Sequence, residues 1–141
     1  MRAVIQRVTQ AQCTTDGREL ASLTGEGLVV LVAAGRGDTP SQAETLARKI
    51  AELKLLRGDR SVQEAAAPVL LISQFTLYGD TRKGRKPSWS KAAPGAEAEP
   101  LVERVALELE GRGLVVGRGQ FGADMRVSLT NDGPVTLIVE T

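Results

Sequence analysis

The stretch Leu28-Val29-Val30-Leu31-Val32-Ala33-Ala34 decides the fold. An unbroken apolar run of this length is typical of a strand, and the lack of alternation with polar residues is typical of a strand covered on both faces. We therefore predict a central strand here, and we expect the neighbouring elements to form a sheet around it.

Before this stretch, residues 2–8 have the pattern of a first strand, in which Ala3, Ile5 and Arg7 share one face. Asp16-Gly17 is a strong signal for a hairpin turn with a short strand on each side. Gly25-Glu26-Gly27 predicts a second turn just before the central strand.

After the central strand, Thr39 is a predicted helix N-cap, with Pro40 at the first helical position and Gln42 completing a capping box. Gly58 closes this region, and residues 57–67 are predicted to form a polar, alanine-rich connection. The apolar residues that recur at helical spacing on one face are Ala43, Leu46, Ala47, Ile50 and Leu53.

Residues 69–78 predict a long strand, and a second helix is expected over about residues 100–110. Further strands are expected over residues 114–116, 125–130 and 135–140. Because strands dominate and the two helices are well separated, we predict an α+β fold with a mixed or antiparallel sheet, forming one domain over residues 1–141. The stripe of the second helix consists of Leu101, Val105 and Leu109.

The composition excludes several kinds of site. The 141 residues include no histidine and one cysteine, Cys13, which excludes a Ser-His-Asp triad, a His-ligated zinc site and a disulfide within the chain. No stretch of about 18 apolar residues could span a membrane. With a net charge of +1, any nucleic-acid site must be local. We expect a cytoplasmic protein with no metal, no cofactor, no membrane partner and no DNA partner.

Three segments have residue types suited to chemistry. In Ser73-Gln74-Phe75-Thr76-Leu77-Tyr78, a strand turns polar at its carboxyl end, where its hydroxyls either line a cleft or only bond to the backbone.

A basic loop, residues 80–91, carries five basic residues between Arg82 and Lys91, and also Trp89. Such a loop either binds RNA phosphates and bases or is simply solvated, with the tryptophan packed on the domain. Asn131-Asp132-Gly133-Pro134 predicts an ordinary hairpin turn between two strands.

Together these segments resemble the D-aminoacyl-tRNA deacylase family over almost the whole chain. The resemblance rests mainly on Ser73-Gln74-Phe75-Thr76 and on Asn131-Asp132-Gly133-Pro134-Val135-Thr136, supported by the amino-terminal strand and the basic loop. Many members carry a longer acidic segment with a Met-Asn pair where this chain has Arg57-Gly58-Asp59-Arg60. No substrate contact is therefore carried over onto this segment.

The resemblance implies a barrel-like sheet with two main helices, and a homodimer with two active sites at the subunit interface. It implies hydrolysis of the ester that joins a D-amino acid, or glycine, to the acceptor end of tRNA. In the implied site, Gly133-Pro134 of one subunit enters the pocket of the other with a cis peptide bond, and Arg7 holds that motif. The pocket would be lined by Ser73, Gln74, Phe75 and Thr76 with Ala123 and Met125, and the tRNA phosphates would be bound by Arg82, Lys83, Arg85 and Lys86.

Two roles for Thr76 stay open. It is either a nucleophile, for which no neighbouring base is identifiable, or a residue that positions the substrate while the 2′-hydroxyl of the tRNA assists the reaction. In the second reading, which we prefer, a backbone N–H near Phe75 or Thr76 stabilises the oxyanion. Three other functions remain in view: an RNA-binding module without catalysis, an interaction domain that dimerises through edge strands, and a hydrolase of small esters or amides.

Overall fold

Strand β2 (Arg18–Ala33) is the centre of a five-stranded sheet, as the apolar run predicts. The computed structural model describes residues 1–141 and has the strand order β4-β3-β2-β1-β5. Strand β1 (Arg2–Thr15) runs antiparallel to both β2 and β5 (Arg126–Glu140), whereas β3 (Val69–Ser73) is parallel to β2 and to β4 (Val116–Arg118). The predicted mixed sheet is therefore confirmed.

The β1–β2 hairpin is longer than predicted. Asp16 and Gly17 form its turn with positive φ angles of 49° and 73°, as the Asp-Gly signal requires. The strands beside it have 14 and 16 residues, so the prediction of short strands is wrong. The predicted turn at Gly25-Glu26-Gly27 is also wrong, because these residues lie inside β2. The pairing register shifts between Val8 and Gln10 at this place, so the glycines mark a β-bulge.

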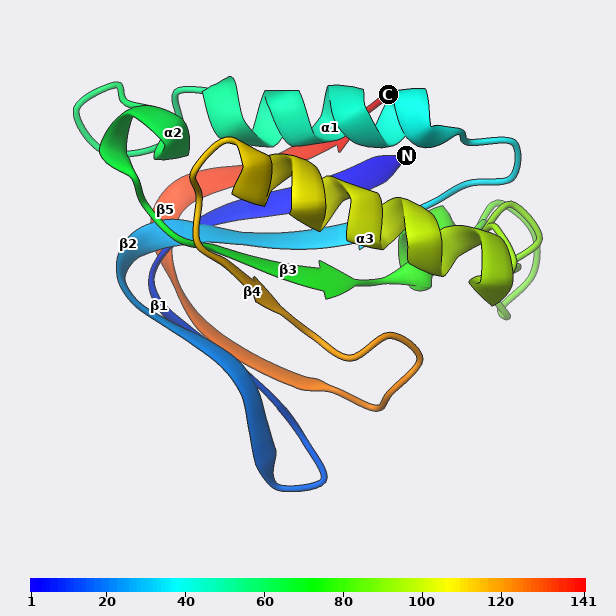
Figure 1. Cartoon of the computed structure of the whole chain (residues 1–141). Helices are drawn as coiled ribbons and strands as arrows, with labels where there is room; N and C mark the ends of the chain where they lie inside the picture. Colours follow the sequence, from blue (N-terminus) through cyan, green and yellow to red (C-terminus); the bar gives the residue numbers. More distant parts are fainter.

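Two main helices, α1 (Pro40–Glu52) and α3 (Gly95–Gly111), cover one face of the sheet (Figure 1). Helix α1 begins after Thr39, and the Gln42 side chain accepts the Thr39 backbone N–H at 2.8 Å, as predicted. Leu53 lies outside α1 and is 36% exposed, so its predicted place in the stripe is wrong. Helix α3 begins earlier than expected and contains Pro100, and the short α2 (Val62–Ala65) was not predicted.

The core has two parts, one on each face of the sheet. The larger part fills the space between the helices and the sheet, and it includes the predicted stripe residues Leu46, Ile50, Val105 and Leu109. The smaller part lies where the hairpin and β5 coil over β3, and it includes Val8, Cys13 and Leu70. No helix combines the length and the apolar character needed to cross a membrane.

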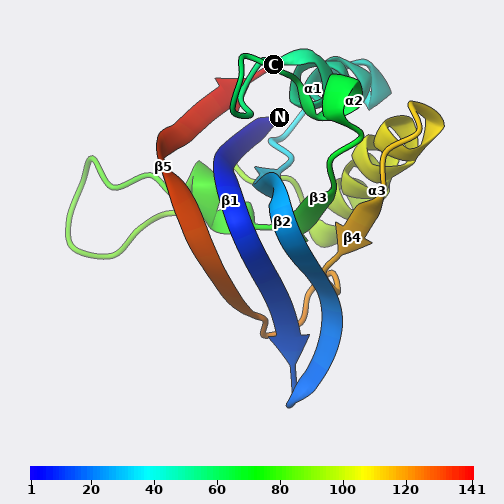
Figure 2. The same cartoon turned by 90° about the vertical axis from the view of Figure 1, so that its left-hand side faces the viewer.

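Strand β5 is one continuous edge strand, so the predicted hairpin at residues 131–134 is wrong. Both halves of β5 pair with β1: Arg126 to Asn131 lie opposite Thr14 to Val8, and Thr136 to Glu140 lie opposite Gln6 to Arg2. Residues 132–135 lie outside this ladder, and Arg7 alone stands opposite them. We call these residues the prolyl bulge; the strand bends near its middle in Figure 2.

Candidate active site

The chain changes conformation at the end of β3. It leaves the sheet at Gln74, whose N–H still donates to the Val32 carbonyl at 2.8 Å, and it enters the 3₁₀ helix η1 (Phe75–Tyr78). The predicted long strand over residues 69–78 is therefore wrong, and the alternation of side chains expected from it does not occur. The first bond of this turn joins the Leu77 N–H to the Gln74 carbonyl at 3.2 Å. The N–H groups of Phe75 and Thr76 precede it and have no partner within the turn.

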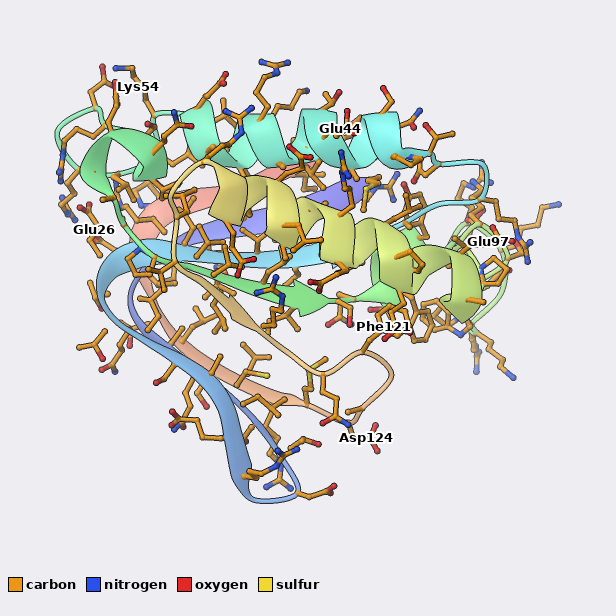
Figure 3. The ribbon with its side chains drawn as sticks, in the orientation of Figure 1. Glu26, Glu44, Lys54, Glu97, Phe121 and Asp124 are labelled. Carbon is orange, nitrogen blue, oxygen red and sulfur yellow. The ribbon has the colours of Figure 1, made fainter.

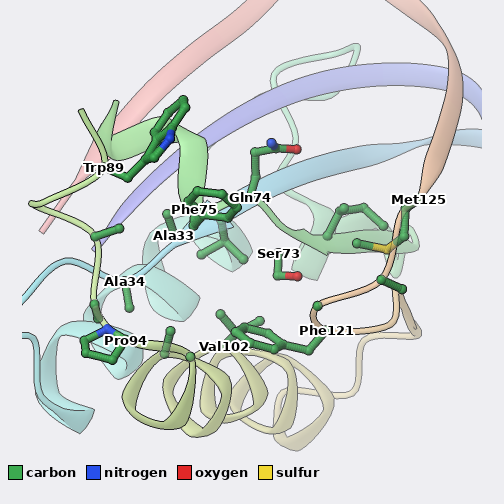
Figure 4. Close-up of a pocket in the computed structure, with 18 of the residues that line it drawn as sticks. Ala33, Ala34, Ser73, Gln74, Phe75, Trp89, Pro94, Val102, Phe121 and Met125 are labelled. Carbon is green, nitrogen blue, oxygen red and sulfur yellow. The ribbon is translucent and has the colours of Figure 1, made fainter. Parts of the chain in front are cut away.

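A cavity of about 680 Å³ lies beside this turn, and we call it the β3 cavity. It is bounded by the end of β3, by helix α3 and by the loop that leads into β5 (Figure 4). The structure brings five of the predicted residues together around it: Ser73, Gln74, Phe75, Ala123 and Met125. Thr76 is not among the residues that line it.

Several residues of the β3 cavity were not predicted from the sequence. Phe121 and Val102 lie next to each other on one side of it, and Ala34 and Pro94 close another side (Figure 4). Phe121 is one of the few aromatic residues of the chain, which is the one signal that could have drawn attention to it. The lining is mainly apolar, as is usual for small-molecule sites.

Phe75 and Trp89 form one edge of the β3 cavity. Their rings meet edge to face with centroids 5.5 Å apart, although Phe75 remains 56% exposed. Trp89 also lies against Gly79, where a Cβ atom would stand 2.7 Å from the indole ring. Trp89 therefore packs on the domain and lines the cavity at the same time.

Two hydroxyl groups near the turn have distinct surroundings. The Gln74 side-chain amide donates a hydrogen bond to the Thr76 hydroxyl oxygen. The Tyr78 ring lies against Gly35 and beneath the Arg2 guanidinium, 4.9 Å from the ring centroid. Burial, with a smaller contribution from Asp38, raises the pKa of Tyr78. The phenol therefore stays protonated at neutral pH and is not a base for Thr76.

The prolyl bulge is held from within its own chain. The peptide bond Gly133–Pro134 is cis. Arg7 is buried and donates from Nε to the Asp132 carbonyl at 3.1 Å, while its Nε also lies 3.1 Å from the Asp132 carboxylate. The Asn131 side-chain amide donates to the carbonyls of Arg7 at 2.9 Å and Val135 at 3.1 Å.

The prolyl bulge borders a second cavity of about 520 Å³, which we call the bulge cavity. It is lined by Arg7, Lys54, Arg57 and Pro134 among others, and it shares no residue with the β3 cavity. Figure 3 shows Lys54, beside the bulge cavity, at the opposite end of the molecule from Phe121 and Asp124 of the β3 cavity. Within one chain, then, the predicted pocket residues and the predicted Gly133-Pro134 pair are apart.

The basic loop projects from the side of the sheet away from α1 and α3 (Figure 2). Backbone bonds between Asp80 and Ser88, 2.8 and 2.9 Å long, close it at its base. Arg82 forms hydrogen bonds with both carboxylate oxygens of Asp80, and this holds the pKa of that carboxyl far below its usual range. The other predicted phosphate contacts, Lys83, Arg85 and Lys86, are exposed and form no ion pair.

No cluster of three or more His, Cys, Asp or Glu residues is arranged to bind a metal ion. The chemistry that this chain itself offers consists of the two free backbone N–H groups, the Ser73 and Thr76 hydroxyls and an apolar cavity wall. Such a set can bind an acyl group and stabilise a negatively charged oxygen.

Comparison with known proteins places the chain in a family. The sequence profile of the family described as D-Tyr-tRNA(Tyr) deacylase matches residues 4–140. Proteins named D-aminoacyl-tRNA deacylase from Acidothermus cellulolyticus and Kineococcus radiotolerans are 57% and 54% identical, and in each case 99% of both chains is covered.

Solved structures agree with this placement. A solved protein named c-Myc DNA Unwinding Element Binding Protein is 35% identical, covers 100% of this chain and 99% of its own, and gives a TM-score of 0.91. A structure described as that of a probable eukaryotic D-amino acid tRNA deacylase has the same fold, with a TM-score of 0.87, 16% identity and coverage of 99% and 98%. The resemblance seen in the sequence is confirmed: the chain belongs to the D-Tyr-tRNA(Tyr) deacylase family, a family of hydrolases.

Proposed function

We propose that this protein is a cytoplasmic homodimer that hydrolyses the ester between a D-amino acid and the terminal ribose of tRNA. The observation that carries the proposal is the separation of the β3 cavity from the prolyl bulge within one chain. Each is an incomplete site, because the first has an open apolar pocket and the second presents backbone to the outside. In the proposal, the prolyl bulge of one subunit enters the β3 cavity of the other.

A row of apolar residues on the sheet, half-buried in its centre and exposed at its edge, supports the dimer. Ile138, Val4 and Leu31 are neighbours across β5, β1 and β2, so they share the face of the sheet away from the helices. Ile138 lies on the edge strand and is 73% exposed. A second copy is the occupant that would cover this row and bring the prolyl bulge to the β3 cavity, since a twofold interface uses the same patch twice.

The reaction that we propose needs no protein nucleophile. Water adds to the ester carbonyl carbon, and the free N–H groups of Phe75 and Thr76 stabilise the resulting oxyanion. The intermediate then expels the ribose oxygen, which takes up a proton, and the free amino acid and tRNA are released. The neighbouring 2′-hydroxyl of the tRNA assists the water or the leaving oxygen, while Ser73, Gln74 and Thr76 position the substrate.

Discrimination in this scheme is steric. The main chain of Gly133 and Pro134 would occupy the volume into which an L side chain projects, and its carbonyls would accept hydrogen bonds from the α-amino group. L-substrates are then rejected by clash. Glycine has no side chain to exclude, so glycyl-tRNA is also cleaved. Arg82, Lys83, Arg85 and Lys86 bind acceptor-stem phosphates without reading the sequence, which suits an enzyme that acts on many tRNAs.

A direct test compares three substrates. The purified protein is incubated with D-tyrosyl-tRNA, L-tyrosyl-tRNA and glycyl-tRNA, and the release of each amino acid is followed. We expect release from the D and glycyl substrates only. Equal cleavage of both tyrosyl forms, or cleavage of neither, would overturn the proposal. Equal cleavage of a free D-tyrosine ester would show that the tRNA is not required.

A second candidate is nucleic-acid binding without catalysis. The exposed basic loop favours it, and so does the likeness to a solved protein whose name refers to binding a DNA element. This function gives no role to the β3 cavity. It predicts binding of single-stranded DNA as tight as that of tRNA, with no release of amino acid from any aminoacyl-tRNA.

A further inference from the structure

Arg57 forms two hydrogen bonds with Asp132, the residue just before the Gly133-Pro134 pair. Its side chain donates twice to the Asp132 carboxylate, from Nε at 2.9 Å and from Nη2 at 2.6 Å. These bonds, more than those of Arg7, lower the pKa of the Asp132 carboxyl. Asp132 is thus held at its carboxylate by Arg57 and at its carbonyl by the buried Arg7. The paired, planar geometry of Arg57 also fixes the orientation of the carboxylate.

The segment that carries Arg57 is anchored in turn to the central strand. The Arg57 backbone N–H donates to Glu26 Oε1 at 2.6 Å, and Arg60 Nη2 donates to Glu26 Oε2 at 3.0 Å. Glu26 belongs to the bulge in β2. Arg7 reaches the same segment, with a bond of 3.2 Å from Nη1 to the Leu55 carbonyl. Figure 3 shows Glu26 and Lys54 together at this end of the molecule.

Two bulges, in β2 and in β5, are therefore joined by the segment over residues 55–60. Within one chain, Arg57 does not line the β3 cavity. Among the contacts of Arg57, the bidentate bond to Asp132 is the one that reaches the prolyl bulge.

We infer that Arg57 is a positioning residue: through its bidentate bond to Asp132 it holds the prolyl bulge in the position that discriminates between D- and L-substrates. The inference rests on the proposed function. Without Arg57, Arg7 alone holds Asp132, and the main chain at Gly133 and Pro134 gains freedom to move. An L-substrate is rejected by clash only if the main chain of Gly133 and Pro134 stays in place. A D-substrate puts no side chain into the volume that this main chain occupies, so its binding does not depend on that position. Loss of Arg57 therefore raises cleavage of the L-substrate and leaves cleavage of the D-substrate nearly unchanged.

The test measures the ratio of L-tyrosyl-tRNA to D-tyrosyl-tRNA cleavage in Arg57→Ala, Arg57→Lys, Asp132→Asn and the double variant Arg57→Ala with Asp132→Asn. We expect Arg57→Ala to raise the ratio about two- to fivefold, as for a well-formed ion pair near the surface. Arg57→Lys should restore only part of the discrimination, because an ammonium group cannot form the two parallel hydrogen bonds of a guanidinium with a carboxylate. The ratio in the double variant should be no higher than in Asp132→Asn alone, because both substitutions remove the same bond. Arg48→Ala, which breaks a different exposed ion pair on α1, is the matched control.

A second measurement varies the salt concentration. Arg57 is 66% exposed along its side chain, so salt screens its pair with Asp132. The ratio should rise with salt in the wild type and not in Arg57→Ala, and the salt dependence of tRNA binding cancels because both substrates carry the same tRNA. If the wild type discriminates and Arg57→Ala discriminates equally, the inference is wrong and the proposed function stands. A wild type without discrimination overturns both.

Discussion

The Gln74 side-chain amide donates a hydrogen bond to the hydroxyl oxygen of Thr76, two residues further along the chain. The Thr76 oxygen is the acceptor in this bond, and a donor aimed at it makes it a weaker nucleophile. The chain holds no histidine, and the nearby Tyr78 phenol stays protonated. This arrangement suits a hydroxyl that positions a substrate, and it does not suit one that attacks an ester.

Thr76→Ala should retain substantial activity. We expect the rate constant for D-tyrosyl-tRNA to fall by no more than about tenfold, because water and not threonine is the proposed attacking group. A substrate that ends in 2′-deoxyadenosine should lose about 10²–10³-fold, a loss comparable to that of a catalytic donor. Single-turnover rates measure both effects. Complete loss in Thr76→Ala, with fold and binding intact, would make Thr76 the nucleophile.

Single substitutions in the basic loop should change the salt dependence of tRNA binding unequally. Lys83→Ala, Arg85→Ala and Lys86→Ala should each reduce the slope of log affinity against log salt by about 0.7–0.9. Arg82→Ala should reduce it less, because Asp80 already neutralises this side chain in the free protein. Binding titrations over a range of salt measure the slopes. Unchanged slopes in all four variants would place the tRNA site elsewhere.

Gly79→Ala should disturb the edge of the β3 cavity. The added methyl would stand 2.7 Å from the Trp89 ring and 3.0 Å from the Thr76 carbonyl oxygen. We expect a loss of about 1–3 kcal/mol in stability, as for overpacking elsewhere. Trp89 is the single tryptophan of the chain, so a change in its fluorescence reports the displacement. Gly111→Ala, where a methyl meets nothing within 4 Å, is the control.

Ile138→Glu should prevent dimer formation. A charge in the centre of an apolar contact is costly to bury without a partner. Light scattering should show a monomer, and deacylation should be lost with the shared site. Val115→Glu changes a residue that is equally exposed, at 72%, but lies outside the proposed interface. A variant at Ile138 that stays dimeric and active would show that this face is free in solution.

Acid should remove the contribution of the ion pair that joins α3 to β4. Arg118 donates twice to Glu110 and lowers the pKa of that carboxyl below its ordinary value of 4.5. A lowered carboxyl pKa stabilises the folded state above the unfolded value, and this gain is lost as the pH falls through the folded value. Glu110→Gln should therefore cost up to about 1 kcal/mol at neutral pH, and the cost should shrink at an acid pH well below 4.5. Thermal unfolding at both pH values measures the difference.

Local signals in the sequence were enough for much of the fold. The apolar run at residues 28–34, the Asp16-Gly17 turn and the cap at Thr39 each depend on neighbouring residues alone, and the structure has all three. The wrong predictions concern places where pairing with a neighbouring strand determines the local structure. Glycine occurs in both turns and bulges, so only pairing with β1 reveals that Gly25 lies within a strand.

The candidate site was less accessible to pattern analysis. Periodicity predicted a continuous strand through Gln74, because Ser73-Gln74-Phe75-Thr76 alternates as a strand would. The 3₁₀ turn forms there since no strand continues beside it: the pairing of β2 with β3 ends at Val32 and Ser73. Resemblance to a family supplied residues such as Ala123 and Met125, which no local signal would have selected.

The side chain of Asn131 has a consequence for how the proposed dimer assembles. Proline has no amide hydrogen, and the Asn131 side chain donates instead to the carbonyl of Arg7 in β1 and to the carbonyl of Val135 beyond the bend. The protruding main chain is thus already rigid in an isolated subunit. Association would then cost little conformational entropy at this point, as with a ligand cyclised in its bound shape.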